Sequence, residues 1–328
     1  ASVTESLSVM AYDRTGFAWV DGTSSGAYNE DGTLKENADV IYVTPDNKDT
    51  VSLAVVKDAK GNKQTATGLQ NILDLVKKGY ANPLDIRMIG NITDFAVMDH
   101  GDIVVDGSSK GNTNGVTFEG IGEDATANGW GIRLKNVSNV EVRNIGFMNC
   151  DSEEGDDVGL QQGNDHVWVH NCDMFYGDAG SDADQVKGDG ALDCKRSTYI
   201  TFSYNHFWDN GKCNLLGLKG ESDDMYITYH HNWYDHSDSR HPRVRSYSAH
   251  VYNNYYDGNS KYGIGACLAS SVFAENNYFR NCKYPMMISE QGSDVYGSNV
   301  GTFSSENGGM IKACGNVIFG AARFVDQT

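Results

Sequence analysis

The second half of the chain repeats a short pattern, and this repeat limits the possible folds more than any other feature. Each unit has an apolar run, then an asparagine, then aromatic residues, as in YITFSYNHFWDN, MYITYHHNWYDH, AHVYNNYYDG, VFAENNYFRN and KACGNVIFG. The asparagines are spaced by 27, 22, 23 and 39 residues, with Cys172 in the equivalent place earlier: Asn205, Asn232, Asn254, Asn277 and Asn316. A short period interrupted by insertions is typical of a solenoid.

A period of about 22 residues accommodates three strands of about five residues with their turns. We therefore predict an all-β fold, a right-handed parallel β-helix; a propeller fits less well because its repeat is about 40 residues. Stacked coils would align the asparagines, so that each side-chain amide hydrogen-bonds to the next coil. The aromatic residues of the repeats are expected in the core rather than as platforms for sugars. His230 and His231 are likewise expected to pack in a ladder.

One helix is predicted, over Leu69–Val76, where apolar residues recur at helical spacing. Thr67 is the expected N-cap, and Gly79 and Pro83 end the segment. Such a helix would cover the N-terminal edge of the β-helix. Residues 1–66 are polar and glycine-rich, and we expect an N-terminal layer of strands or irregular structure there. Only four prolines are present and no proline-rich linker, so residues 1–328 are predicted to form one domain.

The net charge of −18 argues against nucleic acid and anionic membranes as partners. An acidic polymer is an equally poor partner unless positive charge is gathered locally. No apolar run approaches the ~20 residues of a membrane-spanning helix. The chain opens on ASVTESLSVM, and an Ala-Ser start fits the residues that follow a cleaved signal peptide. We therefore expect a secreted, extracellular protein.

Seven cysteines are present, and none is part of a C-x-x-C motif, which argues against a zinc ribbon or a thioredoxin-type site. The odd number leaves at least one cysteine without a partner in the same chain. Buried thiols and a disulfide framework both remain open.

Three segments gather groups that could perform chemistry. GDGALDCK places Asp189 and Asp193 four residues apart, and WDNGKCNLLG contributes Lys212. The segment SRHPRVR holds a cluster of basic residues: Arg240, His241, Arg243 and Arg245. This cluster supplies the local positive charge that an acidic substrate requires.

The order and spacing of these segments resemble the catalytic core of the pectate lyases, polysaccharide lyase family 1. The blocks that carry the resemblance are WVHNCDMF, GDGALD, SYNHFWDNGK, YHHNWYD and RHPRVR, within a continuous match over Arg133–Tyr256. The resemblance implies a parallel β-helix with long loops that form a groove. It also implies cleavage of polygalacturonate, a plant cell-wall polymer, by calcium-dependent β-elimination that leaves 4,5-unsaturated products.

The resemblance assigns calcium to three carboxylates: Asp157, Asp189 and Asp193. Oxygen ligands of this kind are those that Ca²⁺ prefers. Some family members carry another acidic residue two positions before the first of these. That position is Gly155 here, flanked by Glu154 and Asp156, and whether either supplies a fourth ligand stays open.

The resemblance gives the remaining roles to basic residues. Arg240 is the expected catalytic base, Lys212 and Arg245 bind the substrate carboxylate, and Arg243 and His241 contact substrate. Elimination removes a C5 proton beside a carboxylate, and this proton is a poor acid while the carboxylate is ionised. Calcium, lysine and arginine would offset that charge. Arginine ordinarily keeps its own proton, so the role of Arg240 rests on the resemblance.

Three other functions compete with this interpretation. Pectin lyases act on methyl-esterified chains and carry a basic residue where calcium carboxylates would sit, whereas Asp189 and Asp193 are acidic. A glycoside hydrolase would pair carboxylates with water, but the Asn-Thr-Asp and Gly-His-Gly blocks of polygalacturonases are missing. A non-enzymatic β-helix that binds polysaccharide has no need of such a charged constellation. We expect a monomer, and endo or exo action stays open.

Overall fold

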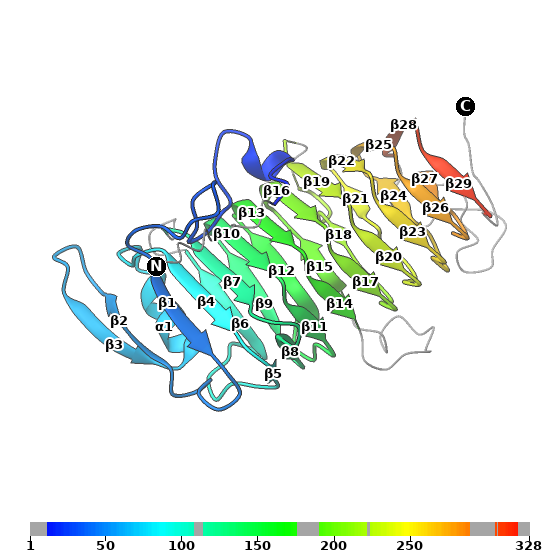
Figure 1. Ribbon diagram of the computed structural model, residues 1–328. Helices are drawn as coiled ribbons and strands as arrows, with labels where there is room; N and C mark the ends of the chain where they lie inside the picture. Colours follow the sequence, from blue (N-terminus) through cyan, green and yellow to red (C-terminus); the bar gives the residue numbers. More distant parts are fainter. Residues whose placement is uncertain are drawn as a thin grey trace, which may run out of the picture.

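The computed structural model describes residues 12–107, 114–175, 190–221, 224–288, 306 and 308–320. Within these residues the chain passes through three parallel sheets in turn, and each coil adds one strand to each sheet (Figure 1). The described chain is therefore a parallel β-helix, which confirms the fold predicted from the repeat.

The three sheets run along the length of the molecule. The ten-stranded sheet contains β1 (Asp39–Val43), β4 (Leu84–Met88), β7 (Val116–Gly120), β10 (Ser138–Arg143), β13 (Asp165–His170), β16 (Thr198–Ser203), β19 (Tyr226–His230), β22 (Ser248–Tyr252), β25 (Ser271–Glu275) and β28 (Met310–Cys314). The nine-stranded sheet contains β5 (Asn91–Ile92), β8 (Thr126–Asn128), β11 (Gly146–Met148), β14 (Asp173–Phe175), β17 (His206–Trp208), β20 (Trp233–Asp235), β23 (Tyr255–Asp257), β26 (Tyr278–Arg280) and β29 (Val317–Phe319). The eight-stranded sheet contains β6 (Asp102–Asp106), β9 (Gly131–Lys135), β12 (Asp156–Gln162), β15 (Gly190–Cys194), β18 (Leu215–Leu216), β21 (Arg243–Arg245), β24 (Ile264–Cys267) and β27 (Met286–Ile288).

The repeated asparagines form the predicted ladder. The Oδ1 of Asn232 accepts a bond from the Asn205 backbone N–H at 3.0 Å, and Asn254 does the same for Asn232 at 2.9 Å. Each Nδ2 also donates to a backbone carbonyl of the preceding coil, as Asn254 does to Tyr229 at 3.0 Å. Because these amides are buried, the ladder satisfies turn backbone that water cannot reach.

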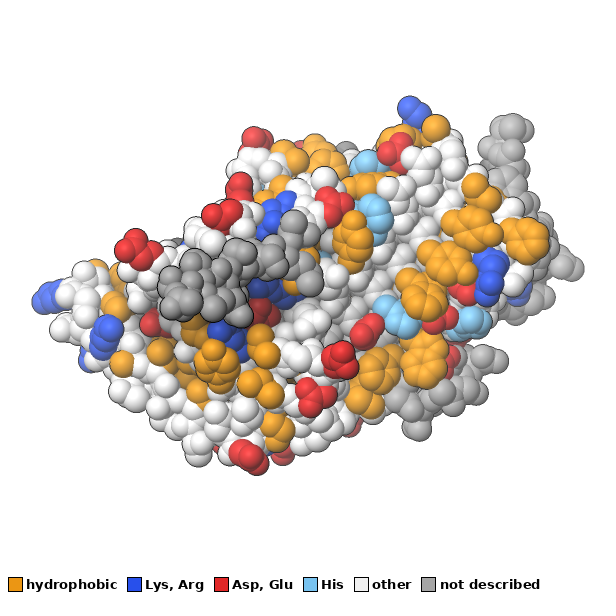
Figure 2. All heavy atoms as spheres, viewed as in Figure 1, with side chains coloured by type: hydrophobic (Ala, Val, Ile, Leu, Met, Phe, Trp, Pro, Cys, Tyr) orange, Lys and Arg blue, Asp and Glu red, His pale blue; other side chains and the backbone are white. Residues whose placement is uncertain are grey.

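The aromatic residues of the repeats divide between inside and outside. One from each coil is fully buried and stacks on the next, in the order Phe207, Tyr234, Tyr256 and Phe279. Others line the outer face of the nine-stranded sheet, where Trp208, Trp233 and Tyr278 are 40–42% exposed (Figure 2). The expectation of a core position is therefore confirmed for the first set and wrong for the second. Alternate residues of a strand point to opposite faces, and both kinds of position are aromatic here.

The N-terminal end is closed by helix α1 (Leu69–Val76), with the predicted bounds. Its N-cap is Gly68 in a left-handed conformation (φ 86°), not Thr67. Gln70 donates to the carbonyl of Val104 at 3.1 Å and accepts from its N–H at 2.8 Å, which satisfies backbone of the edge strand β6. A hairpin of β2 (Ser52–Val56) and β3 (Lys63–Thr67) packs beside the helix.

Residues 12–28, here called the N-terminal strap, cross the outer face of the ten-stranded sheet (Figure 1). The strap includes the 3₁₀ turn η1 (Phe17–Trp19). Its backbone N–H groups donate to threonines of three coils of this sheet: Phe17 to Thr228, Ala18 to Thr201 and Ala27 to Thr117, each at 3.0 Å. The irregular layer expected at the N-terminus is thus tied to the sheet by side-chain oxygens.

All seven cysteines are free thiols; six are buried and Cys314 is exposed. Of the two possibilities that the sequence leaves open, the structure shows thiols. In the residues that the structure describes, no helix has the length and apolar character needed to span a membrane.

Candidate active site

Most of the predicted site residues lie on consecutive coils of the eight-stranded sheet. Asp193 is on β15, Lys212 precedes β18, and Arg240 precedes β21. Lys212 pairs with Ser239 in a parallel bridge, and its carbonyl accepts from the Ala191 N–H at 3.1 Å. Backbone pairing therefore brings Asp193, Lys212 and Arg240, which are 19 and 28 residues apart in sequence, onto three consecutive coils. Asp189 lies outside the described residues.

Two carboxylates meet at the floor of this site, above Gly190. Asp156 on β12 pairs with Gly190, the first residue of β15. A Cβ atom at Gly190 would lie 2.5 Å from Asp156 Oδ1 and 2.7 Å from Asp193 Oδ1. Only glycine leaves room for both carboxylates here. Asp193 is also oriented by its backbone surroundings, because its Oδ1 accepts from the Leu215 N–H at 2.8 Å.

Asp157, the residue expected to bind calcium, lies elsewhere. Its side chain is 4% exposed, and burial alone raises the pKa of its carboxyl well above the usual value. Asp156, one residue earlier, is the carboxylate that meets Asp193. Adjacent residues of a strand point to opposite faces, so the geometry at Gly190 favours Asp156, and calcium binding by Asp157 stays a prediction.

A lysine accompanies the carboxylate pair. Lys195 Nζ lies 3.6 Å from Asp156 Oδ2 and 3.5 Å from Glu154 Oε2. Burial would lower the pKa of this lysine, but the charges of Asp156, Asp193 and Glu154 outweigh burial and raise it. Lys195 follows Asp193 by two residues on the same strand face, and this spacing could have identified it from the sequence.

Arg240 stands apart from the other arginines of its cluster. It adopts a left-handed backbone conformation (φ 64°), and its carbonyl accepts from the Asn214 N–H at 2.7 Å. Among the described residues, no carboxylate lies within ion-pair distance of its guanidinium. Its side chain is partly exposed. Arg240 is thus a cation that the described fold leaves without a counter-ion.

Arg243 and Arg245 on β21 share one acidic partner, Glu306. The carboxylate of Glu306 bonds to Nε of Arg245 and lies 3.5 Å from a terminal nitrogen of Arg243. Burial would raise the pKa of Glu306, but Arg245 and Arg243 hold it below its usual value. Arg245 also donates to the Gly217 carbonyl at 3.3 Å. Nothing in the sequence pointed to Glu306, which lies about 60 residues after these arginines and outside the repeats.

His241 does not face the site. It is fully buried, its Nδ1 lies 2.7 Å from the Tyr262 carbonyl oxygen, and its ring packs edge-on against Tyr234. Burial lowers its pKa to about 3. The structure therefore does not bring the His241 ring to the surface, and the expected substrate contact stays a prediction.

The carboxylate floor suits a hard cation. Asp156 and Asp193 offer oxygen atoms only, and they converge at the place that a Cβ atom of residue 190 would fill. Glu154 and Asp156 both contact the Lys195 amine. Calcium takes six to eight such oxygens, often including water. The residues present fit this ion, with Asp156 in the place that the sequence assigned to Asp157.

Comparison with known proteins agrees with this geometry. A family model described as pectate lyase matches residues 2–317. A pectate trisaccharide-lyase of Bacillus licheniformis is 30% identical over 254 residues, covering 76% of this chain and 70% of that protein. Pectate lyase 1 of Pectobacterium atrosepticum is 31% identical over 290 residues, covering 81% and 73%.

Solved structures show the same fold. A pectate lyase of Bacillus sp. N165, crystallised in complex with trigalacturonate, superposes with a TM-score of 0.71 at 22% identity, over 94% of this chain and 88% of that chain. Pectate lyase C of Erwinia chrysanthemi, solved with Ca²⁺, gives 0.62 at 22% identity, over 93% and 79%. The chain belongs to the pectate lyase family, whose members are lyases that act on polysaccharide.

Proposed function

We propose that this chain cleaves unesterified polygalacturonate by calcium-dependent β-elimination. The observation that carries the proposal is the placement of acidic and basic groups along the eight-stranded sheet. Asp156 and Asp193 converge above Gly190. Arg240 precedes β21, two coils beyond Asp193 on β15, and has no carboxylate partner among the described residues. The relative in complex with trigalacturonate supports a galacturonate polymer as substrate.

The acidic residues would hold the ion. Asp156 and Asp193 are its ligands, with Asp189 and Glu154 as further candidates. When bound, calcium offsets the charge of the substrate carboxylate and so makes the neighbouring C5 proton more acidic. Lys195 keeps the two described aspartates from repelling one another before the ion binds.

The basic residues would bind substrate and move the proton. Lys212 and Arg245 contact uronate carboxylates, with Arg243 beside them. Arg240 takes the C5 proton, and the electron pair of that bond forms the C4–C5 double bond. The C4–O bond breaks, its electrons leave with the oxygen, and that oxygen takes a proton from water. Arg243 and Arg245 share Glu306 as an ion-pair partner, whereas no described carboxylate lies within ion-pair distance of Arg240.

A pectin lyase, acting on methyl-esterified chains, is the alternative. The carboxylate floor argues against it, because esterified substrate needs no cation to offset its charge. We also propose that the enzyme acts outside the cell on plant cell-wall pectin, since a long anionic polymer does not cross a membrane.

Digestion of polygalacturonate with and without a calcium chelator tests the function. We expect ultraviolet absorbance from the unsaturated product in calcium, its loss in chelator, and recovery when calcium is restored. Highly methyl-esterified pectin should be cleaved more slowly. Faster cleavage of the esterified polymer, indifferent to chelator, would establish the pectin lyase alternative instead.

A further inference from the structure

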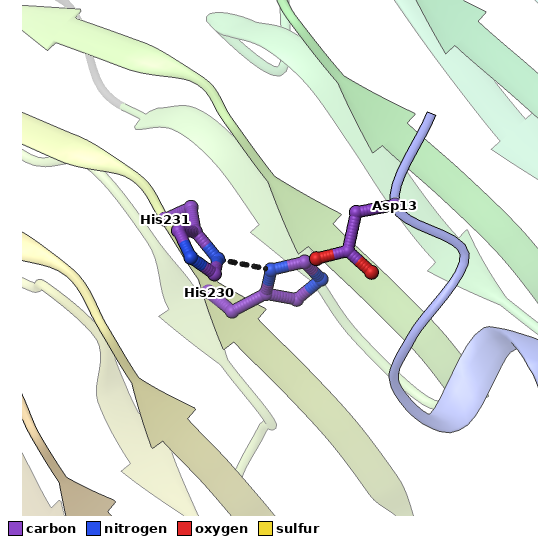
Figure 3. A group of neighbouring side chains, drawn as sticks. All are labelled: Asp13, His230 and His231. Atoms are coloured by element: carbon purple, nitrogen blue, oxygen red, sulfur yellow. Dashed lines mark hydrogen bonds between the residues drawn. The ribbon is translucent and has the colours of Figure 1, made fainter. Parts of the chain in front are cut away.

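A second group of possible metal ligands lies on the ten-stranded sheet, away from the lyase site. β19 ends at His230, and His231 follows in a left-handed conformation (φ 53°). This turn brings two consecutive imidazole rings together, so that their Nδ1 atoms lie 2.8 Å apart (Figure 3). In an extended strand the two side chains would point to opposite faces.

The N-terminal strap completes the group with Asp13. One carboxylate oxygen of Asp13 and one ring nitrogen from each histidine lie within 4.8 Å of one another (Figure 3). The strap is anchored just after this point. Thr15 Oγ1 lies 2.9 Å from the Tyr252 hydroxyl, and the Phe17 N–H donates to Thr228 at 3.0 Å.

The surroundings orient each of the three groups. His230 Nε2 lies 3.3 Å from the Thr15 carbonyl, so its proton belongs on Nε2 and its Nδ1 turns a lone pair toward His231 and Asp13. The Tyr204 hydroxyl donates to Asp13 Oδ2 at 3.2 Å, and its ring stacks on His231 at 4.6 Å. Metal-binding histidines typically donate their second N–H to a carbonyl in this way.

We propose that Asp13, His230 and His231 form a binding site for a zinc-class divalent cation. Two imidazole nitrogens and one carboxylate oxygen are the ligands that zinc and similar ions prefer, and three protein ligands leave a position for water. Tetrahedral ligands at about 2.0–2.1 Å from zinc lie about 3.3 Å apart, so the two Nδ1 atoms need to separate by only about half an ångström. His231 is partly exposed and can make this movement.

The ligand chemistry separates this site from the carboxylate floor. Asp156 and Asp193 offer oxygen only and suit calcium, whereas the histidines select an ion that accepts nitrogen. The bound ion would fasten the strap to β19 and thereby stabilise the N-terminal layer over the ten-stranded sheet. This role is independent of the lyase function.

A similar surface cluster provides a matched control. Asp235, His236 and Asp257 also lie close together. There, however, Arg280 binds both oxygens of Asp257 at 2.9 Å, and His206 lies 3.0 Å from Asp235. These carboxylates already have cationic or hydrogen-bonding partners, so His236→Ala should not affect zinc binding.

The test is calorimetric titration of zinc chloride into the full chain, stripped of metal and then saturated with calcium. We expect one equivalent of zinc to bind, with affinity at least ten-fold weaker in Asp13→Asn and in His231→Ala and unchanged in His236→Ala. Zinc should also raise the melting temperature of the wild type and of His236→Ala, but not of the other two variants. Absence of zinc binding by the wild type, or equal binding by all four proteins, would overturn the proposal.

Discussion

Two outer faces of the β-helix carry the same residue types but differ in how their charges are neutralised. On the ten-stranded sheet, each of two arginines lies between two carboxylates. Arg87 is 2.8 and 2.9 Å from Asp85 and Glu119, and Arg143 is 2.6 and 3.1 Å from Glu119 and Glu141. The N-terminal strap covers this network, and Tyr28 donates to two of its carboxylates.

On the eight-stranded sheet the charged groups are arranged differently. Asp156 and Asp193 converge with Lys195 as their described cationic neighbour, and Arg240 has no carboxylate partner among the described residues. The difference teaches that the residue type alone does not reveal a site. Charged side chains that pair with one another within the fold stabilise the structure. Charged side chains at a ligand site can support binding and catalysis.

The largest expected effect comes from replacing one arginine on each face. Arg240→Lys keeps the positive charge but loses the planar guanidinium, and kcat should fall by about 10²–10⁴-fold, the usual contribution of a well-placed base. Arg87→Lys should leave kcat unchanged and lower stability, since hydrogen bonds to charged groups contribute about 1.5–3 kcal/mol. Steady-state kinetics and thermal melts of both variants measure this contrast.

The comparison breaks if the two variants exchange behaviour. Near-normal kcat in Arg240→Lys would remove that residue from the chemistry, even with the family unchanged. A loss of kcat in correctly folded Arg87→Lys would show that the ten-stranded face takes part in the reaction.

The second prediction separates two adjacent aspartates. Asp156→Asn removes a charged ligand from the carboxylate floor, so the calcium concentration for half-maximal activity should rise about ten-fold or more, with partial rescue by excess calcium. Asp157→Asn should leave that concentration unchanged, because Asp157 is buried away from the pair. Calcium titrations of activity would contradict this account if Asp157→Asn gave the larger shift. Asp193→Asn should behave as Asp156→Asn does.

A smaller effect is expected at Glu306. Its carboxylate accepts a hydrogen bond from Arg245 and lies beside Arg243. It therefore competes with the uronate carboxylate of the substrate for these two arginines. Glu306→Gln should therefore lower KM for polygalacturonate about five-fold, equivalent to about 1 kcal/mol for a partly exposed ion pair, with little change in kcat. A raised KM would instead mean that Glu306 positions the arginines for substrate.

The last prediction concerns pH and the ten-stranded face. Burial, followed by the charge of Glu119, raises the pKa of Asp85 to about 7. The folded protein therefore holds a proton that the unfolded chain releases near pH 4, so this contribution to stability is lost as pH rises from about 4 to about 7. The asparagine in Asp85→Asn does not titrate. As pH increases over that range, the free energy of unfolding of this variant, taken relative to that of the wild type, should therefore increase by up to about 1.4 kcal/mol per pH unit. Denaturant melts at several pH values would contradict this if the difference were flat.

The sequence is sufficient to predict the structural features that repeat or that have a local period. The Asn205–Asn316 ladder and the Leu69–Val76 helix follow from spacing alone. The resemblance points to Asp157, whereas the structure brings Asp156 to Asp193, because the pairing of Asp156 with Gly190 is not visible in the sequence.

Other features depend on contacts between distant segments. Asp13 of the strap lies beside His230 and His231, which follow it by more than 200 residues. Glu306 contacts β21, although it comes after β27, the last described strand of the eight-stranded sheet. No periodicity marks such pairs, because the coil stacking that brings them together is a property of the folded chain.

The central claim is that the charged groups of the eight-stranded face serve β-elimination rather than hydrolysis. Digestion of polygalacturonate in water enriched in heavy oxygen, followed by mass spectrometry of the fragments, distinguishes the two directly. Elimination breaks the C4–O bond without adding water, so we predict an unsaturated end for every cleavage and no incorporated label. Fragments that carry heavy oxygen at their new ends, with no unsaturated product, would show hydrolysis and contradict the account.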